Sequence, residues 1–328
     1  MLPIITHTFV LTRLALHYLR IVVSLRVYRR LAAAHETSLL QVHGSGTTNP
    51  SKCIWMLQQQ MEQRSKIPMR LTYRGIGSGG GFFEFLGVNN TGAFNYTPYN
   101  DFASADIPLS TEDYNALKDK GIEMVHLPFV VGSVGVFYQD LISSDDIVEE
   151  YDSKEPPTVN LTACNLAKIF KRNITSWNDP EIVKNNPSIN EILPADHSAP
   201  IYVARRVNGS SSTASLTEYL NLACPEEWLE SMVGSVIEWP ADTMECEGSA
   251  AMSQCLVDTP GAIGYMESGH GWAENFTEVE LENKAGRFLT SLESSEKGAI
   301  VDAVVDIPDS ADADFGSVNL LNKVRDDC

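Results

Sequence analysis

The chain repeats one local pattern, in which an apolar strand-like segment runs into a glycine-rich or hydroxyl-rich turn and then into helical spacing. The strand, turn and helix segments are 38–42, 44–48 and 50–61 in the first copy, 69–73, 75–81 and 82–86 in the second, and 201–204, 205–213 and 214–222 in the third. This order is typical of a parallel sheet that is covered by helices. The repetition therefore predicts an α/β protein.

Length and composition suit more than one domain. The 328 residues match one large or two ordinary domains at about 150 residues each. Hydrophobic residues make up 43% of the chain, which is enough for a sizeable core. Residues 124–138 form a β-rich apolar run, interrupted by Pro128 and Gly132, of the kind that crosses between domains. Shorter patterns predict a helix start at 165–170 and a turn with a buried strand at 256–265.

The charge of the chain is strongly acidic and unevenly placed. Five of the 24 Lys and Arg residues precede Glu36, so the rest of the chain carries 19 basic against 43 acidic groups, or a formal −24. Nucleic acids and anionic lipids are bound by clustered Lys and Arg, so neither is expected as a partner. The same charge opposes small anions, unless local dipoles and one cation outweigh it.

Residues 1–37 are predicted to be a targeting or anchor segment outside the fold. A membrane span needs about 20 apolar residues, whereas Arg13 and Arg20 interrupt this run. A secretory signal carries its charge before the apolar stretch and small residues after it. Only the small residues at 31–34 fit that order, so an Arg-rich organellar transit peptide is an equal alternative.

The cysteines and glycosylation motifs bear on the compartment. Six cysteines form no CxxC pair and have no His at ligand spacing, so a zinc site is not expected. Cys246 and Cys255 are the most plausible local disulfide. Six Asn-x-Ser/Thr motifs exceed the chance expectation and favour a secretory route. They lie at Asn89, Asn95, Asn160, Asn173, Asn208 and Asn275.

Three turns bring hydroxyl groups to helix starts. Thr47 and Thr48 lie in the first turn, Ser78 in the second, and residues 210–213 in the third. Helix N-termini carry unpaired N–H groups and about half a positive charge, so convergent turns of this kind can cradle an anion. Arg206, just before the third turn, can add a bidentate guanidinium. The turns together predict an anion site.

Enzymatic alternatives rest on weaker patterns. Gly75, Gly77 and Gly80 match the dinucleotide motif GxGxxG, with Asp101 about 20 residues on. That acid should end a second strand, whereas residues 96–101 are turn-like. The seven His residues are scattered, with no Ser-His-Asp set and no nucleophile–base pair. No catalytic residue, metal or cofactor is therefore predicted.

At this point the chain resembles a known family, the phosphate-binding proteins of bacterial phosphate-uptake transporters. These are type II solute-binding proteins, of the two-domain Venus-flytrap kind. The matching blocks keep their order and spacing from about Gln41 to Thr290. They are GSGTTNP at 44–50, YRGIGSGG at 73–80, DFASADIPLS at 101–110, LPFVVG at 127–132, ITSWNDP at 174–180, RRVNGSSS at 205–212 and PGAIGY at 260–265.

The resemblance implies a set of phosphate ligands. They are Thr48 and the backbone of Asn49 in the first turn, Ser78 in the second, Asp106, and Arg206, Asn208, Ser210, Ser211 and Ser212 in or beside the third. Asp106 matches a carboxylate that touches the anion. A buried carboxylate there is repulsive unless the anion brings a proton, which hydrogen phosphate has and sulfate lacks, so Asp106 would select against sulfate. It could instead only cap the turn before Pro108.

The chain also departs from the family's pattern. Asn208 replaces an acid that usually pairs with the arginine, Ser211 stands where glycine is preferred, and Asn49 where an aromatic residue is preferred. The family continues beyond the point that matches Cys328, which leaves the end of the first domain open.

The resemblance also implies the organisation and the role of the chain. We expect residues 38–127 plus 277–328 to form domain 1 and residues 128–276 to form domain 2, with hinges near Leu127 and Glu278. The expected function is capture of inorganic phosphate for uptake or sensing, without catalysis, by a monomer that meets a membrane transporter or receptor. A secreted or membrane-associated secretory location is expected, with an organelle or the bacterial periplasm as alternatives. A phosphatase, a dinucleotide oxidoreductase and a degenerate non-binding scaffold stay open as alternative functions.

Overall fold

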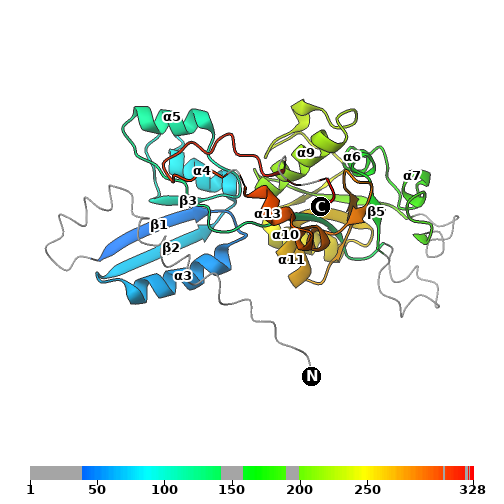
Figure 1. Cartoon of the computed structure of the whole chain (residues 1–328), viewed down its shortest axis with the longest axis horizontal. Coiled ribbons are helices and arrows are strands. Elements are labelled where there is room, and N and C mark those ends of the chain that lie inside the picture. Colours follow the sequence, from blue (N-terminus) through cyan, green and yellow to red (C-terminus); the bar gives the residue numbers. More distant parts are fainter. Residues whose placement is uncertain (1–38, 142–157, 190–198, 306, 322–323, 325) are drawn as a thin grey trace, which may run out of the picture.

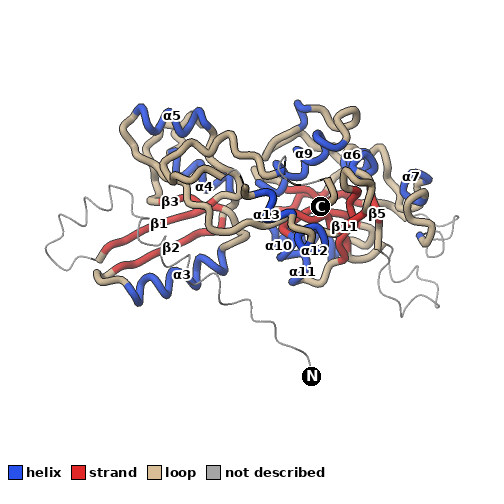
Figure 2. The backbone as a smooth tube through the Cα atoms, in the orientation of Figure 1, coloured by secondary structure: helices blue, strands red, loops and turns tan. Residues whose placement is uncertain are grey.

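The computed structural model describes residues 39–141, 158–189, 199–305, 307–321, 324 and 326–328. Figure 1 shows two bodies side by side, each with its own sheet and helices. The targeting or anchor segment predicted at 1–37 lies outside the described residues. Within the described part, no helix combines the length and the hydropathy that a membrane span requires. The α/β prediction is confirmed by the alternation of strands and helices (Figure 2).

The first body, residues 39–122, is built on a small parallel sheet. Its strands run in the order β2-β1-β3, and Gly46 at the end of β1 is level with Gly75 on one side and Ser104 on the other. All three strands therefore end at one edge, where the turns that follow them gather. The elements are β1 (Leu40–Gly46), α3 (Ser51–Arg64), β2 (Met69–Gly75), α4 (Ser78–Leu86), β3 (Phe102–Ser104) and α5 (Thr111–Asp119).

The second body, residues 134–305, has a larger mixed sheet in the order β7-β6-β8-β4-β9. The strands are β4 (Val134–Tyr138), β6 (Tyr202–Arg206), β7 (Met244–Cys246), β8 (Ala262–Glu267) and β9 (Thr277–Glu278). β6 is parallel to β7 and β8, whereas β4 is antiparallel to β8 and β9. The carboxyl ends of β6 and β8 therefore point the same way, toward the first body's turns.

Helices and a minor sheet complete the second body. The minor sheet has the order β11-β10-β5. Its strands are β5 (Asn160–Leu161), β10 (Glu280–Glu282) and β11 (Phe288–Leu289). The helices are α6 (Ala163–Phe170), α7 (Pro180–Val183), α9 (Ser211–Ala223), η2 (Glu230–Met232), α10 (Gly248–Asp258), α11 (Ser268–Ala273), α12 (Ser291–Glu296) and α13 (Ala299–Ala303).

The two bodies differ in their cores. The second body buries a continuous cluster that includes Phe137, Phe170, Trp177 and Trp228. The first body has a cluster of three buried residues, Leu86, Leu109 and Leu117, with partly buried aromatic residues around it. Since hydrophobic stabilisation scales with the apolar area that is buried, the second body holds most of the packing energy.

Both disulfides of the described chain lie in the second body. Cys246–Cys255 joins the end of β7 to α10, as predicted, and Cys164–Cys224 ties α6 to the end of α9. Cys53, on α3, is a free thiol. The second body is therefore held by covalent links as well as by its core.

Several predicted boundaries differ from the structure. Parts of the three predicted turns belong to regular elements: 44–46 to β1, 78–81 to α4, 205–206 to β6 and 211–213 to α9. Only Val134–Tyr138 of the apolar run 124–138 is a strand, and residues 123–133 pass between the bodies without helix or strand. Pro128 cannot donate to a ladder, which disfavours a strand that runs through residue 128. Leu256, predicted in a turn, lies in α10 because its side chain completes the helix face that packs on the sheet.

The returning C-terminal segment also departs from the predicted division. β9 pairs with β4, and β10 pairs with β5, so residues 277–289 belong to the second body rather than to domain 1. Contact with the first body comes later, where the Tyr114 hydroxyl on α5 donates to the carbonyl oxygen of Asp312. In the linking segment, the backbone N–H of His126 donates to the carbonyl oxygen of Ala311, and the His126 ring packs on Phe315. β9 stays in the second body because it pairs with β4 beyond β8 at the edge of the main sheet.

Candidate functional site

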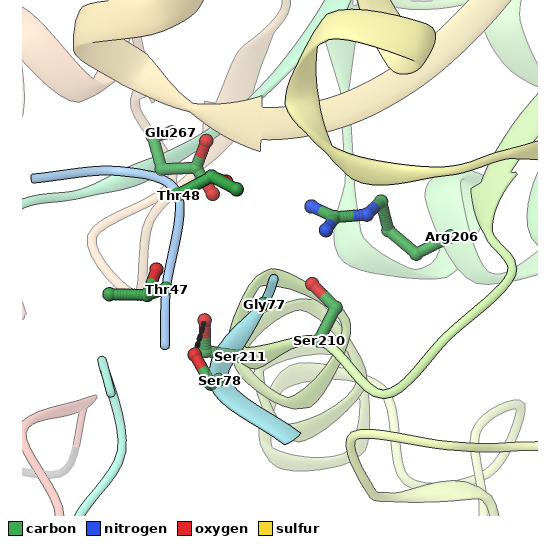
Figure 3. Close-up of a pocket in the computed structure, with 8 residues that line it drawn as sticks. All are labelled: Thr47, Thr48, Gly77, Ser78, Arg206, Ser210, Ser211 and Glu267. Carbon is green, nitrogen blue, oxygen red and sulfur yellow. Dashed lines mark hydrogen bonds between the residues drawn. The ribbon is translucent and has the colours of Figure 1, made fainter. Parts of the chain in front are cut away.

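A small pocket lies where the turns of the first body meet the strand ends of the second (Figure 3). It is lined by Thr47, Thr48, Gly77, Ser78, Arg206, Ser210, Ser211 and Glu267. The residues follow β1 and β2, end β6 and β8, or begin α4 and α9. Ligands of open α/β sheets bind at such carboxyl ends. The cavity volume is about 10 Å³, which is about the space that one enclosed water needs.

Close backbone packing fixes the first turn. Gly46 has a φ of 149°, and a Cβ built there would lie 1.8 Å from the carbonyl oxygen of Ser104. A Cβ on Gly81 would lie 2.6 Å from the Cα of Gly46, so α4 needs glycine to approach β1. The Tyr73 hydroxyl donates to the Thr47 carbonyl at 2.6 Å. The turn that carries Thr47 and Thr48 is thus held from three sides.

Arg206 supplies the positive charge of the pocket. Its residue is 7% exposed, and its Nε has no hydrogen-bond partner among the described residues. Figure 3 shows the guanidinium pointing into the space between Glu267 and Ser210. Arg205, the preceding residue, points elsewhere and pairs with Glu245 at 2.6 Å. A buried guanidinium without an acidic partner is costly, so the geometry indicates that an anion completes it.

Tyr265 holds Arg206 in place from within the sheet. Its hydroxyl accepts a hydrogen bond from the backbone N–H of Arg206 at 3.1 Å. The same hydroxyl lies 2.7 Å from the hydroxyl of Thr213 on α9. Tyr265 is fully buried, and burial raises the pKa of its phenol. One side chain of β8 thereby joins the end of β6 to the first turn of α9.

Two helix N-termini face the pocket. α4 begins at Ser78 and α9 at Ser211, and neither Gly77 nor Ser210, the residues at their N-caps, provides a side-chain cap. The N–H groups of the first turns are therefore open to a ligand, with the positive end of each helix dipole behind them. Ser78, Ser210 and Ser211 are all buried. These donors add no net charge, which suits an anion site in an acidic chain.

Asp106 joins the hydroxyl groups of the two bodies. Its Oδ2 accepts from Thr47 Oγ1 at 2.6 Å and from Ser211 Oγ at 2.5 Å, with Ser78 Oγ further away at 3.4 Å. Asp106 is nevertheless exposed and does not line the cavity. The expectation of a buried carboxylate is wrong, because the turn 105–108 lies at the rim and only one carboxylate oxygen faces the hydroxyls.

Further contacts bring the two bodies together around the pocket. Ser78 Oγ lies 3.3 Å from Ser211 Oγ, and Thr48 Oγ1 lies 3.4 Å from Ser249 Oγ. A Cβ on Gly79 would lie 3.5 Å from the carbonyl oxygen of Gly209, so the backbones also approach closely. The structure therefore has the two bodies in contact on both sides of the cavity.

Apart from Asp106, the predicted residues fall into three groups. Thr48, Ser78, Arg206, Ser210 and Ser211 line the pocket. The Ser212 hydroxyl is buried beside it and donates to Glu267 at 2.6 Å. Asn49 and Asn208 are exposed and outside the lining; the amide of Asn49 donates to Asp106, and that of Asn208 to Glu247.

The ligand set that the resemblance implies omitted three residues that line the pocket, although Thr47 was among the hydroxyl groups of the first predicted turn. Thr47 and Gly77 line it and lie next to predicted residues. Glu267 lines it at the end of β8, two residues after the end of the PGAIGY block. Its position after a buried parallel strand is the signal that could have identified it, since side chains at the ends of parallel strands meet at one edge.

The geometry does not favour the alternative sites. Asp101 accepts the backbone N–H of His43 at 2.9 Å and precedes β3, so it does not end a strand as the dinucleotide motif requires. Cys164, Cys224 and Glu226 place their ligand atoms within 4.8 Å of one another, but the two sulfurs form a disulfide and offer no thiolate.

Comparisons with known proteins agree with this fold. The model of the PBP superfamily domain matches residues 31–317. The phosphate-binding protein PstS of Methanocaldococcus jannaschii is 27% identical over 278 residues, which are 83% of this chain and 64% of that protein. PstS of Xylella fastidiosa is 26% identical over 260 residues, 78% of this chain and 61% of that protein. The chain spans about three fifths of the length of these curated relatives.

One solved structure supports the fold independently. A high-affinity periplasmic phosphate-binding protein, PfluDING, bound with phosphate, has a TM-score of 0.58 at 20% identity. The similarity covers 85% of this chain and 72% of that chain. At this identity the likeness speaks for the fold alone. Because the family model spans most of the sequence and the described fold agrees with it, the chain belongs to the PBP superfamily.

Proposed function

We propose that the chain binds inorganic phosphate, as hydrogen phosphate, in the pocket between the two bodies and does no chemistry on it. The observation that carries the proposal is the buried Arg206 guanidinium, which points into a pocket of hydroxyl groups and has no acidic partner there. Two open helix N-termini face the same space. The relatives named as phosphate-binding proteins support the choice of anion.

Discrimination against sulfate is assigned to Asp106. Its Oδ2 already accepts hydrogens from hydroxyls that line the pocket. An anion that takes over those hydroxyls must bring a proton of its own to this carboxylate. Hydrogen phosphate has that proton, whereas sulfate at neutral pH presents only acceptors, so sulfate is repelled.

The proposed ligand set follows the geometry. Thr48, Ser78, Ser210 and Ser211 donate hydroxyls or backbone N–H groups, and Arg206 supplies the charge. Ser212 joins them if its hydroxyl turns from Glu267. Asn49 and Asn208 are exposed. Asn49 is therefore proposed to contribute its backbone only, and Asn208 to lie at the rim of the site.

The wider role is uptake or sensing of phosphate outside the cytoplasm, by a monomer that delivers the anion to a membrane transporter or receptor. Entry of the ligand would require the two bodies, which are in contact in this structure, to open and close again. They are linked by residues 123–133 and by the return near residue 311. We place the second hinge at that return rather than near Glu278, which lies in β9.

The matched pair Arg206→Ala and Arg205→Ala tests the proposal. Removing the Arg206 charge should weaken phosphate affinity by about 100-fold or more, since charge-assisted hydrogen bonds contribute about 1.5–3 kcal/mol each. Arg205→Ala removes the same charge one residue away, from a pair with Glu245, and should leave affinity within about threefold. Calorimetric titration with phosphate measures both. Unchanged affinity in Arg206→Ala would favour a scaffold that has lost its site.

A further inference from the structure

Glu267 is the one acidic side chain among the residues that line the described pocket. It ends β8, next to β6, whose last residue is Arg206. Figure 3 shows Glu267 and Thr48 on one side of the space, Ser78 and Ser211 on the opposite side, and the Arg206 guanidinium reaching between them. A carboxylate at this position would directly face a bound anion.

Hydrogen bonds hold both oxygens of this carboxylate. Ser212 Oγ donates to Oε1 at 2.6 Å, and Ser249 Oγ donates to Oε2 at 2.8 Å. Each serine is the second residue of its helix, α9 or α10, so the carboxylate also lies near two helix N-termini. No ion pair joins Glu267 to a cation of the described chain, and the guanidinium of Arg206 stays available to a ligand.

The pocket and its rim therefore combine one guanidinium with two carboxylates, Glu267 in the lining and Asp106 at the rim. Asp106 contacts the hydroxyls of Thr47, Ser78 and Ser211, all of which line the cavity, and Glu267 lines it directly. Where a carboxylate oxygen meets an oxygen of the anion, a proton must lie between these two atoms. Hydrogen phosphate carries one such proton, which can satisfy only one carboxylate. The dihydrogen form carries two and has one negative charge, matching the single guanidinium.

We propose, on the basis of the phosphate site above, that Glu267 is a second proton-accepting residue and that the pocket takes phosphate with two protons. In the complex, one proton is shared between phosphate and Asp106, and the other between phosphate and Glu267. This revises the protonation state given above: the bound species is dihydrogen phosphate rather than hydrogen phosphate. Above neutral pH, where free phosphate is mainly the dianion, binding must take up a proton from solution.

Calorimetry of the full chain counts that proton. Phosphate is titrated at about pH 8 in buffers of different ionisation enthalpy, and the slope of the observed heat gives the protons taken up. The proposal predicts about one proton per phosphate, and affinity for total phosphate that falls by up to about tenfold per pH unit above the second pKa of phosphate. A pocket that uses Asp106 alone predicts no uptake and a flat profile there.

Glu267→Gln is the decisive variant, because it removes the second acceptor and can donate an N–H in its place. It should abolish the proton uptake and flatten the pH profile. Glu247→Gln is the matched control: it removes a charge from the exposed N-cap of α10, outside the pocket lining, and should keep the wild-type uptake. Thermal unfolding checks that both variants are folded, and the wild-type proton count stands without them.

The outcomes separate the two proposals. Phosphate binding without proton uptake, or uptake that persists in Glu267→Gln, overturns the role of Glu267 and leaves the phosphate site intact. Absence of phosphate binding at every pH from about 6 to about 8 overturns the phosphate site, and the role of Glu267 with it. Uptake of about one proton that disappears only in Glu267→Gln supports both.

Discussion

The two bodies contribute different things to the same pocket. The second body has the larger core, both disulfides of the described chain, and the cation Arg206, whose position Tyr265 sets from inside the sheet. The first body has a core of three buried leucines and supplies hydroxyl groups with a rim carboxylate, Asp106. The costly feature, a buried charge, thus lies in the better-packed half, whereas the neutral donors come from both bodies: Thr48 and Ser78 from the first, and Ser210 and Ser211 from the second.

This difference indicates how an acidic chain can hold an anion site. A formal charge of −19 governs solubility and encounter at long range. Within the pocket, the relevant groups are one guanidinium, several hydroxyls and two helix N-termini, and these act over a few ångströms. Burial of Arg206 reduces screening, so its local effect is larger than that of the exposed acids.

The largest effect on stability is expected from the second body's core. Trp177 is fully buried, and its indole N–H donates to the carbonyl oxygen of Gly261 at 3.1 Å. Trp177→Ala should lower the free energy of unfolding by about 3–5 kcal/mol through the cavity it leaves. Leu117→Ala is the counterpart in the first body, at about 2–5 kcal/mol.

The two variants are expected to differ in which body unfolds first. Leu117→Ala should produce an early transition that is sensed by Trp55 on α3 and leaves the buried tryptophans of the second body unchanged. Trp177→Ala should destabilise the second body. Urea unfolding followed by fluorescence and hydrogen exchange measures both. A single shared transition for both variants would show that the two bodies unfold as one unit.

A smaller effect is expected at the link between Arg206 and α9. Tyr265→Phe removes the hydroxyl that accepts a hydrogen bond from the backbone N–H of Arg206 and contacts Thr213. The buried N–H would lose its partner, at about 1–3 kcal/mol of stability, and the guanidinium would be less well oriented. Phosphate affinity should fall by about three- to tenfold, whereas Tyr138→Phe, in the same core, should leave affinity unchanged. Equal affinities in the two variants would contradict the positioning role of Tyr265.

The smallest predicted effect concerns the first body at alkaline pH. Burial raises the pKa of Tyr73 to about 12, whereas the unfolded chain releases this proton near pH 10. A raised pKa stabilises the fold below the unfolded value, and this contribution is lost as pH rises from about 10 to about 12. Tyr73→Phe should therefore show a shallower loss of stability over that range, measured as urea midpoints. An identical loss of stability in the wild type and in Tyr73→Phe would show that Tyr73 does not cause this pH dependence.

Sequence patterns predicted the parts of the site that follow from local chain geometry. The turns after β1 and β2 place Thr48 and Ser78 at one edge of the first sheet because parallel strands end together, and Arg206 ends β6 in the other sheet, which faces them across the pocket. Contacts between segments that are far apart in the sequence were harder to predict. Nothing local shows that β9 pairs with β4 rather than with the first body, or that Glu267 reaches the pocket through two serines.

The sequence also did not show which side chains of the predicted site are exposed. Asn49, Asn208 and Asp106 lie in the right segments, but their side chains are exposed, because the turns that carry them curve outward at the rim. A motif fixes the backbone of a turn more closely than the direction of each side chain. Buried residues such as Arg206, Ser210 and Ser211 were therefore predicted better than those at the surface.

The most direct test of the account is titration of the full chain with phosphate and with sulfate under the same conditions at neutral pH. The account predicts saturable binding of one phosphate per chain and sulfate affinity lower by at least about 100-fold, because sulfate brings no proton to the carboxylates. Equal affinity for the two anions, or no heat with phosphate, would contradict it.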